Sequence, residues 1–178
     1  GPGSRVLVQG TGGVALFALA FAKLAGCHVT VISSSDEKLA KAKALGADAG
    51  INYTSTPEWS KAARESTSGL GFDHIVELGG EKTLPQSLRA IRPGGTISMI
   101  GVLSGSALSA PLGHVVTRQV RLQGITVGSR DGFEAMMRAI DQHRLVPVVD
   151  RVFAFEELKE AMAALKRGAH FGKICIRH

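Results

Sequence analysis

The stretch Arg5-Val6-Leu7-Val8-Gln9-Gly10-Thr11-Gly12-Gly13-Val14-Ala15 carries the strongest structural signal in this chain. A short apolar, β-branched run ends at Gly10, and an unbroken helical pattern from 14 to 25 follows the glycines. This is a strand, a glycine turn and a helix N-terminus, in the order that dinucleotide-binding folds require. Gly10 permits a tight turn, Gly12 leaves the backbone open to a pyrophosphate, and the small Ala15 allows close packing of helix on strand. The stretch therefore predicts a phosphate-binding loop.

Strand and helix signals alternate along the rest of the chain. This alternation predicts an α/β fold, a Rossmann-type doubly wound parallel sheet of six strands with helices on both faces. The predicted strands are residues 5–9, 27–32, 49–53, 73–78, 96–100 and 120–127. The predicted helices are residues 14–25, 36–45, 57–66, 84–91 and 133–143.

Local signals mark several boundaries of these elements. Ser35 is expected to cap the helix 36–45, and Thr56 with Pro57 is expected to start the helix 57–66. The run Pro93-Gly94-Gly95 is expected to stop the helix 84–91. A loop rich in Ser, Gly and Ala spans residues 103–113, and it is a candidate for ligand contact or for a partner interface.

The chain divides into three expected segments. Gly1-Pro2-Gly3-Ser4 has the composition of a remnant that a protease leaves from an expression tag. Residues 5–146 are the expected dinucleotide-binding domain. The rhythm changes at Pro147, beyond which an extended segment (148–155), a helix (156–167) and a short strand (173–177) are predicted. We interpret residues 147–178 as a C-terminal segment that returns to a catalytic domain.

Composition limits the classes of function. The 178 residues are 44% hydrophobic and carry a net charge of +6, but basic residues alternate with acids along helices and form no cluster with aromatic residues. We therefore expect no nucleic-acid partner, and the longest apolar run is too short for a membrane span. Cys27 and Cys175 lack a C-x-x-C pattern, and the six histidines show no metal-ligand spacing. These features favour buried thiols in the cytoplasm and no metal site in this chain.

Four segments resemble the medium-chain dehydrogenases/reductases, which include zinc-type alcohol dehydrogenases and zinc-free quinone reductases. They are Gly10-Thr11-Gly12-Gly13-Val14, the stretch from Lys38 to Asp48, Arg92-Pro93-Gly94-Gly95, and His170-Phe171-Gly172-Lys173. The resemblance runs from Arg5 to Arg177. It covers the cofactor-binding domain and the C-terminal return of that family, and leaves out its N-terminal catalytic domain.

The resemblance implies an oxidoreductase that transfers hydride between NADP(H), or NAD(H), and a small carbonyl, alcohol or activated alkene. In zinc-type relatives most ligands of the metal lie in the absent domain, so zinc is expected only for a full-length protein. We expect this chain to bind the cofactor, to contain no catalytic residue and to turn over nothing by itself. Relatives also join the edge strand, here 120–127, across a two-fold axis, which implies a homodimer.

The resemblance also assigns cofactor contacts. Gly10, Gly12 and Gly13 would line the pyrophosphate, with N–H groups of Gly13 and Val14 donating. The adenosine side would be read by Ser33, Ser34, Lys38 and Tyr53. For the serines the alternative is simple helix capping, and for Tyr53 it is a half-buried ring at a strand end. Lys173 would reach the cofactor from the tail or lie on the surface.

The ends of the later strands converge at the crevice of the sheet, where ribose and nicotinamide are expected. The candidates there are Leu78, Gly79, Gly101, Val102, Leu103, Gly128, Ser129 and Arg130. Their alternative role is that of simple turn residues. Glu77 is expected to touch a ribose or to point to solvent.

Ser33 stands where NAD-preferring folds place an acid that binds the 2′-hydroxyl, and it carries no charge to repel a phosphate. This favours NADP. Two other classes of function remain open at this point. An S-adenosylmethionine-dependent methyltransferase shares the glycine turn, but generally has an acid at the position of Ser33. A non-enzymatic nucleotide-sensing protein could keep the same fold.

Overall fold

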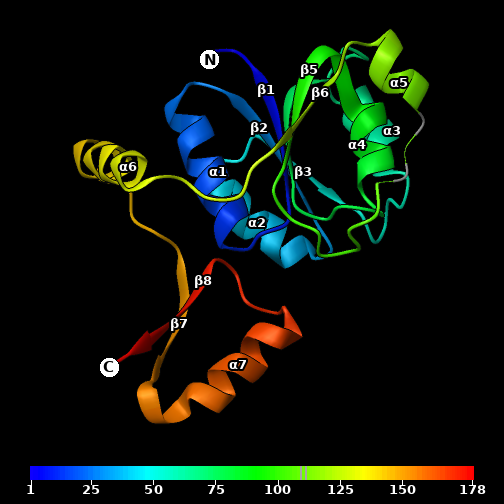
Figure 1. The fold of residues 1–178 in the computed structure, drawn as a ribbon. Helices are drawn as coiled ribbons and strands as arrows, with labels where there is room; N and C mark the ends of the chain where they lie inside the picture. Colours follow the sequence, from blue (N-terminus) through cyan, green and yellow to red (C-terminus); the bar gives the residue numbers. More distant parts are fainter. Residues whose placement is uncertain (109, 111) are drawn as a thin grey trace.

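Six parallel strands form one sheet in the order β3-β2-β1-β4-β5-β6 in the computed structural model, which describes residues 1–108, 110 and 112–178 (Figure 1). Its strands are β1 (Arg5–Gln9), β2 (His28–Ser33), β3 (Ala49–Asn52), β4 (Phe72–Glu77), β5 (Ile91–Met99) and β6 (Arg121–Gly124). Every neighbouring pair is parallel. The order reverses between β1 and β4, which makes this boundary the topological switch point. The predicted doubly wound sheet is confirmed.

Helices cover both faces of the sheet. On one face lie α1 (Gly13–Leu24) and α2 (Asp36–Ala44), and on the other α3 (Trp59–Glu65) and α4 (Leu84–Ala90) (Figure 1). The central strands bury apolar side chains on both faces, as is usual for central parallel strands. In β1, Val6 and Val8 pack in the cluster beneath α1, while Leu7 belongs to the opposite cluster.

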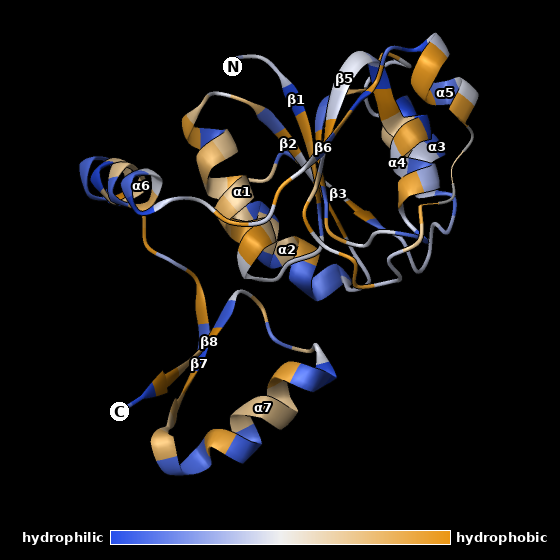
Figure 2. Cartoon of the chain, in the orientation of Figure 1, coloured by the Kyte–Doolittle hydropathy of each residue, from blue (hydrophilic) through white to orange (hydrophobic). Residues whose placement is uncertain are grey.

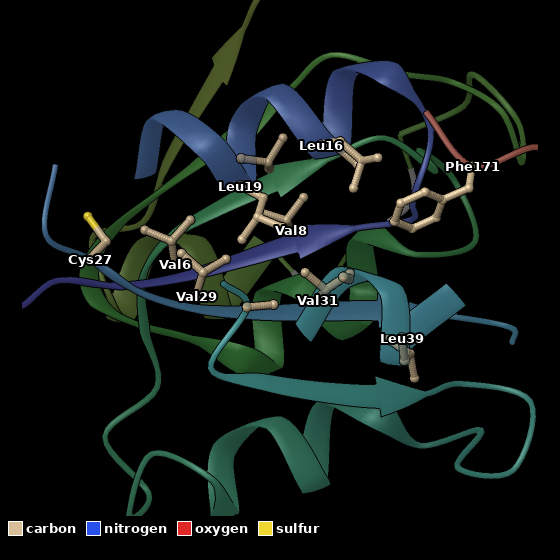
Figure 3. Packing of buried hydrophobic residues seen from close by; sticks show 13 residues of the cluster. Val6, Val8, Leu16, Leu19, Cys27, Val29, Val31, Leu39 and Phe171 are labelled. Atoms are coloured by element: carbon tan, nitrogen blue, oxygen red, sulfur yellow. The ribbon is translucent and has the colours of Figure 1, made fainter. Parts of the chain in front are cut away.

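Figure 3 shows the first cluster, in which Leu16 and Leu19 of α1 lie over Val6 and Val8. Phe171, which comes from the far end of the chain, is only 7% exposed and completes this cluster. The core beneath α1 therefore includes a residue of the C-terminal tail (residues 147–178).

The tail is a second, small β-α-β unit. It consists of β7 (Val149–Ala154), the short 3-10 helix η1 (Phe155–Glu157), α7 (Leu158–Arg167) and β8 (Lys173–Arg177), with β7 and β8 parallel. The predicted order of extended segment, helix and strand is therefore found. Gly172 forms a bridge to Gly12 in the loop before α1. This bridge attaches the tail to the glycine loop.

The remaining helices are α5 (Leu112–Thr117) and α6 (Arg130–His143). Figure 2 shows polar and apolar residues on both α6 and α7, and no residue of α6 is buried. Among its apolar side chains, Phe133 is 57% exposed and Met137 37% exposed. In this chain, α6 therefore leaves apolar side chains in contact with solvent.

Two predicted starts are wrong. The third helix begins at Trp59 with Glu58 as its N-cap, so Thr56 and Pro57 do not start it. The fifth strand begins at Ile91, which pairs with Phe72, and not at residue 96. Pro93-Gly94-Gly95 lies within β5 as an irregularity in its register, where the N–H of Gly94 donates to the Arg118 carbonyl. The helix-stop signal thus marks a break in a strand.

The region after β5 also differs from the prediction. The loop 103–113 gives way to α5 at Leu112, and its residues Ser109 and Pro111 lie outside the described residues. The sixth strand ends at Gly124 and not at residue 127. Both regions are exposed, so core packing imposes little of the periodicity from which elements are recognised.

Candidate functional site

A cleft of about 730 Å³ opens where the C-terminal ends of the strands meet. Gln9 ends β1 and Ile32 lies near the end of β2, while Leu78 and Gly101 follow β4 and β5; all four line the cleft. Open parallel sheets bind ligands in this position, outside the carboxyl ends of the strands at the switch point. Its volume lies within the usual range for small-molecule and cofactor sites.

The glycine loop forms one wall of the cleft. Gly10 has a φ of +79°, a conformation that favours glycine. The first hydrogen bond of α1 runs from the Leu16 N–H to the Gly12 carbonyl, so the N–H groups of Gly13, Val14 and Ala15 have no acceptor within the helix. These N–H groups and the positive end of the helix dipole make this wall suitable for an anion.

Neither backbone conformation nor packing within the chain requires a glycine at position 12. Its φ of −79° and ψ of −178° suit any residue, and no atom lies within 4 Å of the position that a Cβ would take. A side chain at this position would occupy open space in the cleft. The missing side chain therefore matches a ligand that comes close to the backbone.

Lys173, the first residue of β8, extends over the same loop. A Cβ added to Gly13 would collide with the end of the Lys173 side chain, including Nζ. Among the described residues no hydrogen bond or ion pair of this ammonium is found. A cation beside a helix N-terminus is unfavourable unless an anion lies with them. The tail thus brings a positive charge close to Gly13, while Lys173 itself lines a separate cavity of about 330 Å³ beside α1 and not the cleft.

The predicted adenosine contacts fall into two groups. Tyr53 lines the cleft and is 42% exposed, whereas Ser33, Ser34 and Lys38 do not line it. Ser33 is 3% exposed, and its Oγ accepts the Ser35 N–H over 3.4 Å. Lys38 donates from Nζ to the Gly168 carbonyl over 2.9 Å. The expected helix cap at Ser35 is confirmed, because its hydroxyl accepts the Lys38 N–H over 3.3 Å.

The later strand ends also separate into two groups. Leu78, Gly79, Gly101 and Leu103 line the cleft, and Val102 lines an adjoining pocket of about 200 Å³. The predicted residues at the start of α6 line neither of these cavities. They are Gly128, Ser129 and Arg130. Ser129 instead caps α6 by accepting the Gly132 N–H over 3.1 Å.

Several residues of the cleft were not expected from the sequence. Gln9, Trp59, Lys82, Thr83, Gln86 and Ser104 line it. Trp59 is the single tryptophan of the chain and was expected only as a helix residue. The prediction for Glu77 is wrong in both its forms. This side chain is fully buried at the end of β4, where hydrogen-bond donors surround it.

No group of three or more His, Cys, Asp or Glu side chains that could hold a metal ion occurs in the part of the chain that the structure describes. The residues present therefore do not fit a zinc site. The described helices also include none that is long and apolar enough to cross a membrane.

Comparison with known proteins shows the family of this chain. Residues 13–142 match the family described as zinc-binding dehydrogenase. A zinc-type alcohol dehydrogenase-like protein of Schizosaccharomyces pombe is 47% identical over 99% of this chain and 52% of its own length. The zinc-type alcohol dehydrogenase-like protein YogA of Leptosphaeria maculans is 34% identical over 98% of this chain and 51% of its own length. The chain spans about half the length of the curated relatives it matches.

Solved structures agree with this match. A protein of Sinorhizobium meliloti 1021 with a provisional description as alcohol dehydrogenase has a TM-score of 0.94 and 47% identity. It covers 99% of this chain, which matches 51% of that protein. An NAD-dependent alcohol dehydrogenase has a TM-score of 0.93 and 35% identity, over 99% of this chain and 52% of its own.

Proposed function

The chain belongs to the zinc-binding dehydrogenase family, and we propose that it is the nicotinamide-cofactor-binding domain of an oxidoreductase. The full enzyme would be similar to alcohol dehydrogenases or to quinone and enone reductases. The reaction is hydride transfer between NADP(H) and a small carbonyl, alcohol or activated alkene. The nicotinamide supplies or accepts the hydride when bound, and the protein supplies binding and orientation. The substrate class is a proposal that rests on the relatives.

Gly12 is the observation that carries this proposal. Neither backbone strain nor packing within the chain excludes a side chain there, so the open space beside it is explained by a diphosphate. The N–H groups of Gly13 and Val14 donate to the phosphate oxygens, and the Lys173 ammonium balances their charge.

The two halves of the cofactor extend to opposite sides of this point. The adenosine half lies toward the ends of β2 and β3, near Tyr53 and Trp59, and the nicotinamide half toward β4 and β5. The apolar side chains of Leu78, Ile100 and Leu103 border that second half and exclude water from one face of the ring.

We propose NADP as the preferred cofactor, because β2 ends in Ser33 and not in an acid. A solved relative at 35% identity is described as NAD-dependent, which supports the other cofactor. We propose three further properties on the basis of the sequence. The chain pairs through the edge of β6 as a homodimer, acts in the cytoplasm, and is inactive by itself because hydride transfer needs a substrate held over the nicotinamide.

Trp59 provides the test, since this buried residue borders the cleft and a bound reduced nicotinamide would quench its fluorescence. The chain is titrated with NADPH and NADH by fluorescence and with S-adenosylmethionine by calorimetry, because S-adenosylmethionine has no absorption band that would quench the indole. We expect saturable quenching by the reduced cofactors alone, and Gly12→Ala should weaken it by at least about tenfold.

The matched control is Gly132→Ala, which adds the same methyl group to the exposed helix α6, and it should bind like the unmodified chain. Equal binding by Gly12→Ala and the unmodified chain would contradict the diphosphate site. Saturation by S-adenosylmethionine alone would favour a methyltransferase.

A further inference from the structure

Glu77, the last residue of β4, is the only charged side chain that is buried among the described residues. No salt bridge to it occurs within that part of the chain. A buried carboxylate is costly unless hydrogen bonds replace its water. The environment of Glu77 therefore needs a reason beyond packing.

Five donors surround this carboxylate. Oε1 accepts the N–H of Gly79 over 3.0 Å, the N–H of Gly80 over 3.1 Å and the hydroxyl of Thr83. Oε2 accepts the Gln9 Nε2 group over 2.6 Å and the hydroxyl of Ser87. An ionised carboxylate is an acceptor only, and each of its oxygens has more than one donor here.

Gln9 extends this network across the switch point, because it ends β1 as Glu77 ends β4. Its Oε1 accepts the N–H groups of Leu78 over 3.1 Å and of Gly79 over 3.2 Å. All backbone N–H groups of the turn 78–80 thus point to these two side chains. The geometry of the turn depends on both.

Hydrogen bonds also join the turn 78–80 to the loop that follows β5. Ser104 donates to the Gly79 carbonyl from its N–H over 2.7 Å and from its hydroxyl over 2.8 Å. The Glu81 N–H donates to the Gly105 carbonyl over 3.0 Å. Gly79, Gly101, Leu103 and Ser104 all line the β4–β5 side of the cleft. A displacement of the Glu77 side chain would therefore shift the residues that line the β4–β5 side of the cleft.

We propose that Glu77 is a positioning residue for cofactor binding. Its carboxylate, held together with Gln9, fixes the turn 78–80 and through it the loop 101–105, and so sets the shape of the nicotinamide half of the cleft. This inference rests on the proposed function, because it needs a dinucleotide in the cleft. It adds a residue that makes no contact with the cofactor.

Glu77→Gln tests the proposal, since it keeps the size of the side chain but turns one acceptor into a donor that faces other donors. NADPH should bind at least about tenfold more weakly. 2′,5′-ADP, which lacks the nicotinamide half, should bind the folded variant within about threefold of the unmodified chain. A loss of folded protein alone would weaken both ligands by the same factor.

Two further variants keep the test decisive. Ser87→Ala removes one buried donor without changing a residue of the cleft, and it should weaken NADPH more than 2′,5′-ADP even if Glu77→Gln does not fold. Ser98→Ala removes another buried hydroxyl, which pairs with His74 over 2.9 Å, and should change neither ligand.

Unchanged NADPH binding in folded Glu77→Gln, or equal weakening of both ligands there, overturns the positioning role; if that variant does not fold, the same results for Ser87→Ala overturn it. If the unmodified chain binds neither of these ligands nor NADH, the proposed function itself fails.

Discussion

The backbone N–H of Gly172 donates to the carbonyl oxygen of Thr11 over 2.9 Å, across nearly the whole length of the chain. Gly172 has a φ of +88°, and a Cβ there would collide with the Val148 carbonyl. Phe171 before it is buried in the core, and Lys173 after it lies over Gly13. Phe171 and Gly172 thus attach the tail to the glycine loop by a buried ring and a backbone bond, and Lys173 places a positive charge over that loop.

Removing the charge alone should weaken the cofactor and leave the fold intact. Lys173 is exposed, so Lys173→Met should change the melting temperature little. We expect NADPH to bind roughly fivefold to tenfold more weakly at low salt, and the difference to shrink as salt screens the phosphate. Lys159→Met in the exposed part of α7 is the control, and a similar effect of both variants in a binding titration would refute a local role.

The cofactor preference is tested at the end of β2. Ser33→Asp would place a carboxylate where the 2′-phosphate of NADP is expected, and two unit charges about 4 Å apart interact by roughly 4 kcal/mol at an effective dielectric near 20. After solvent screening we expect at least about tenfold weaker NADPH binding. NADH binding should be unchanged or improved.

Calorimetry with both cofactors at one salt concentration measures this preference. Because Ser33 is buried, thermal melts should accompany the titrations, and the affinities should be compared only for folded protein. Equal affinities of the unmodified chain for NADH and NADPH would contradict the preference.

Protonation of Asp48 should account for part of the loss of folding stability at low pH. Burial alone would raise the pKa of Asp48, but hydrogen bonds from Lys23 and from the Val29 N–H outweigh it and hold that pKa below its ordinary value. Its contribution is therefore complete above about pH 4 and is lost as the pH falls through the lowered pKa of the folded state.

Asp48→Asn should lower the free energy of unfolding at pH 7 by about 1 kcal/mol. The difference should narrow below about pH 4, as measured by urea unfolding at a series of pH values. Glu37→Gln removes the exposed pair with Lys41 and should change stability little. A gap between Asp48→Asn and the unmodified chain that does not depend on pH would count against this assignment.

The homodimer is tested at the edge of the sheet. β6 is the last strand, and Ile125 and Val127 beyond it are 42% and 89% exposed. If copies pair there, sedimentation should give twice the chain mass, and Val127→Lys should shift the equilibrium toward the single chain. Leu70→Lys changes an exposed apolar residue away from this edge and should not. A single-chain mass for the unmodified protein at micromolar concentrations would exclude the pairing.

The sheet and the glycine loop could be predicted because their signals are local. Each strand and each helix of the sheet carries its own periodicity, and the turn at Gly10 needs only the residues beside it. α5 and the irregularity at Pro93 were missed because their sequences are typical of loops and helix ends. Their conformation depends on contacts such as that of Gly94 with Arg118, which join distant segments.

The site could be predicted only in part for the same reason. The glycine loop indicates the class of its ligand through backbone geometry alone. Glu77 does not, because an acid at a strand end suggests solvent until Gln9, 68 residues earlier, is brought beside it. Trp59 and Thr83 enter the cleft through the packing of α3 and α4, which no local pattern specifies.

The bond between Gln9 and Glu77 has a consequence for how such sequences can be recombined. Gln9, Glu77, Thr83 and Ser87 form one hydrogen-bonded set, so substitutions at these positions will not be additive. A chimera of two relatives with its crossover between residues 10 and 76 inherits Gln9 from one parent and its three partners from the other. Such crossovers preserve every strand and helix and can still leave a buried carboxylate with the wrong neighbours. Crossovers before residue 9 or after residue 87 keep the set together.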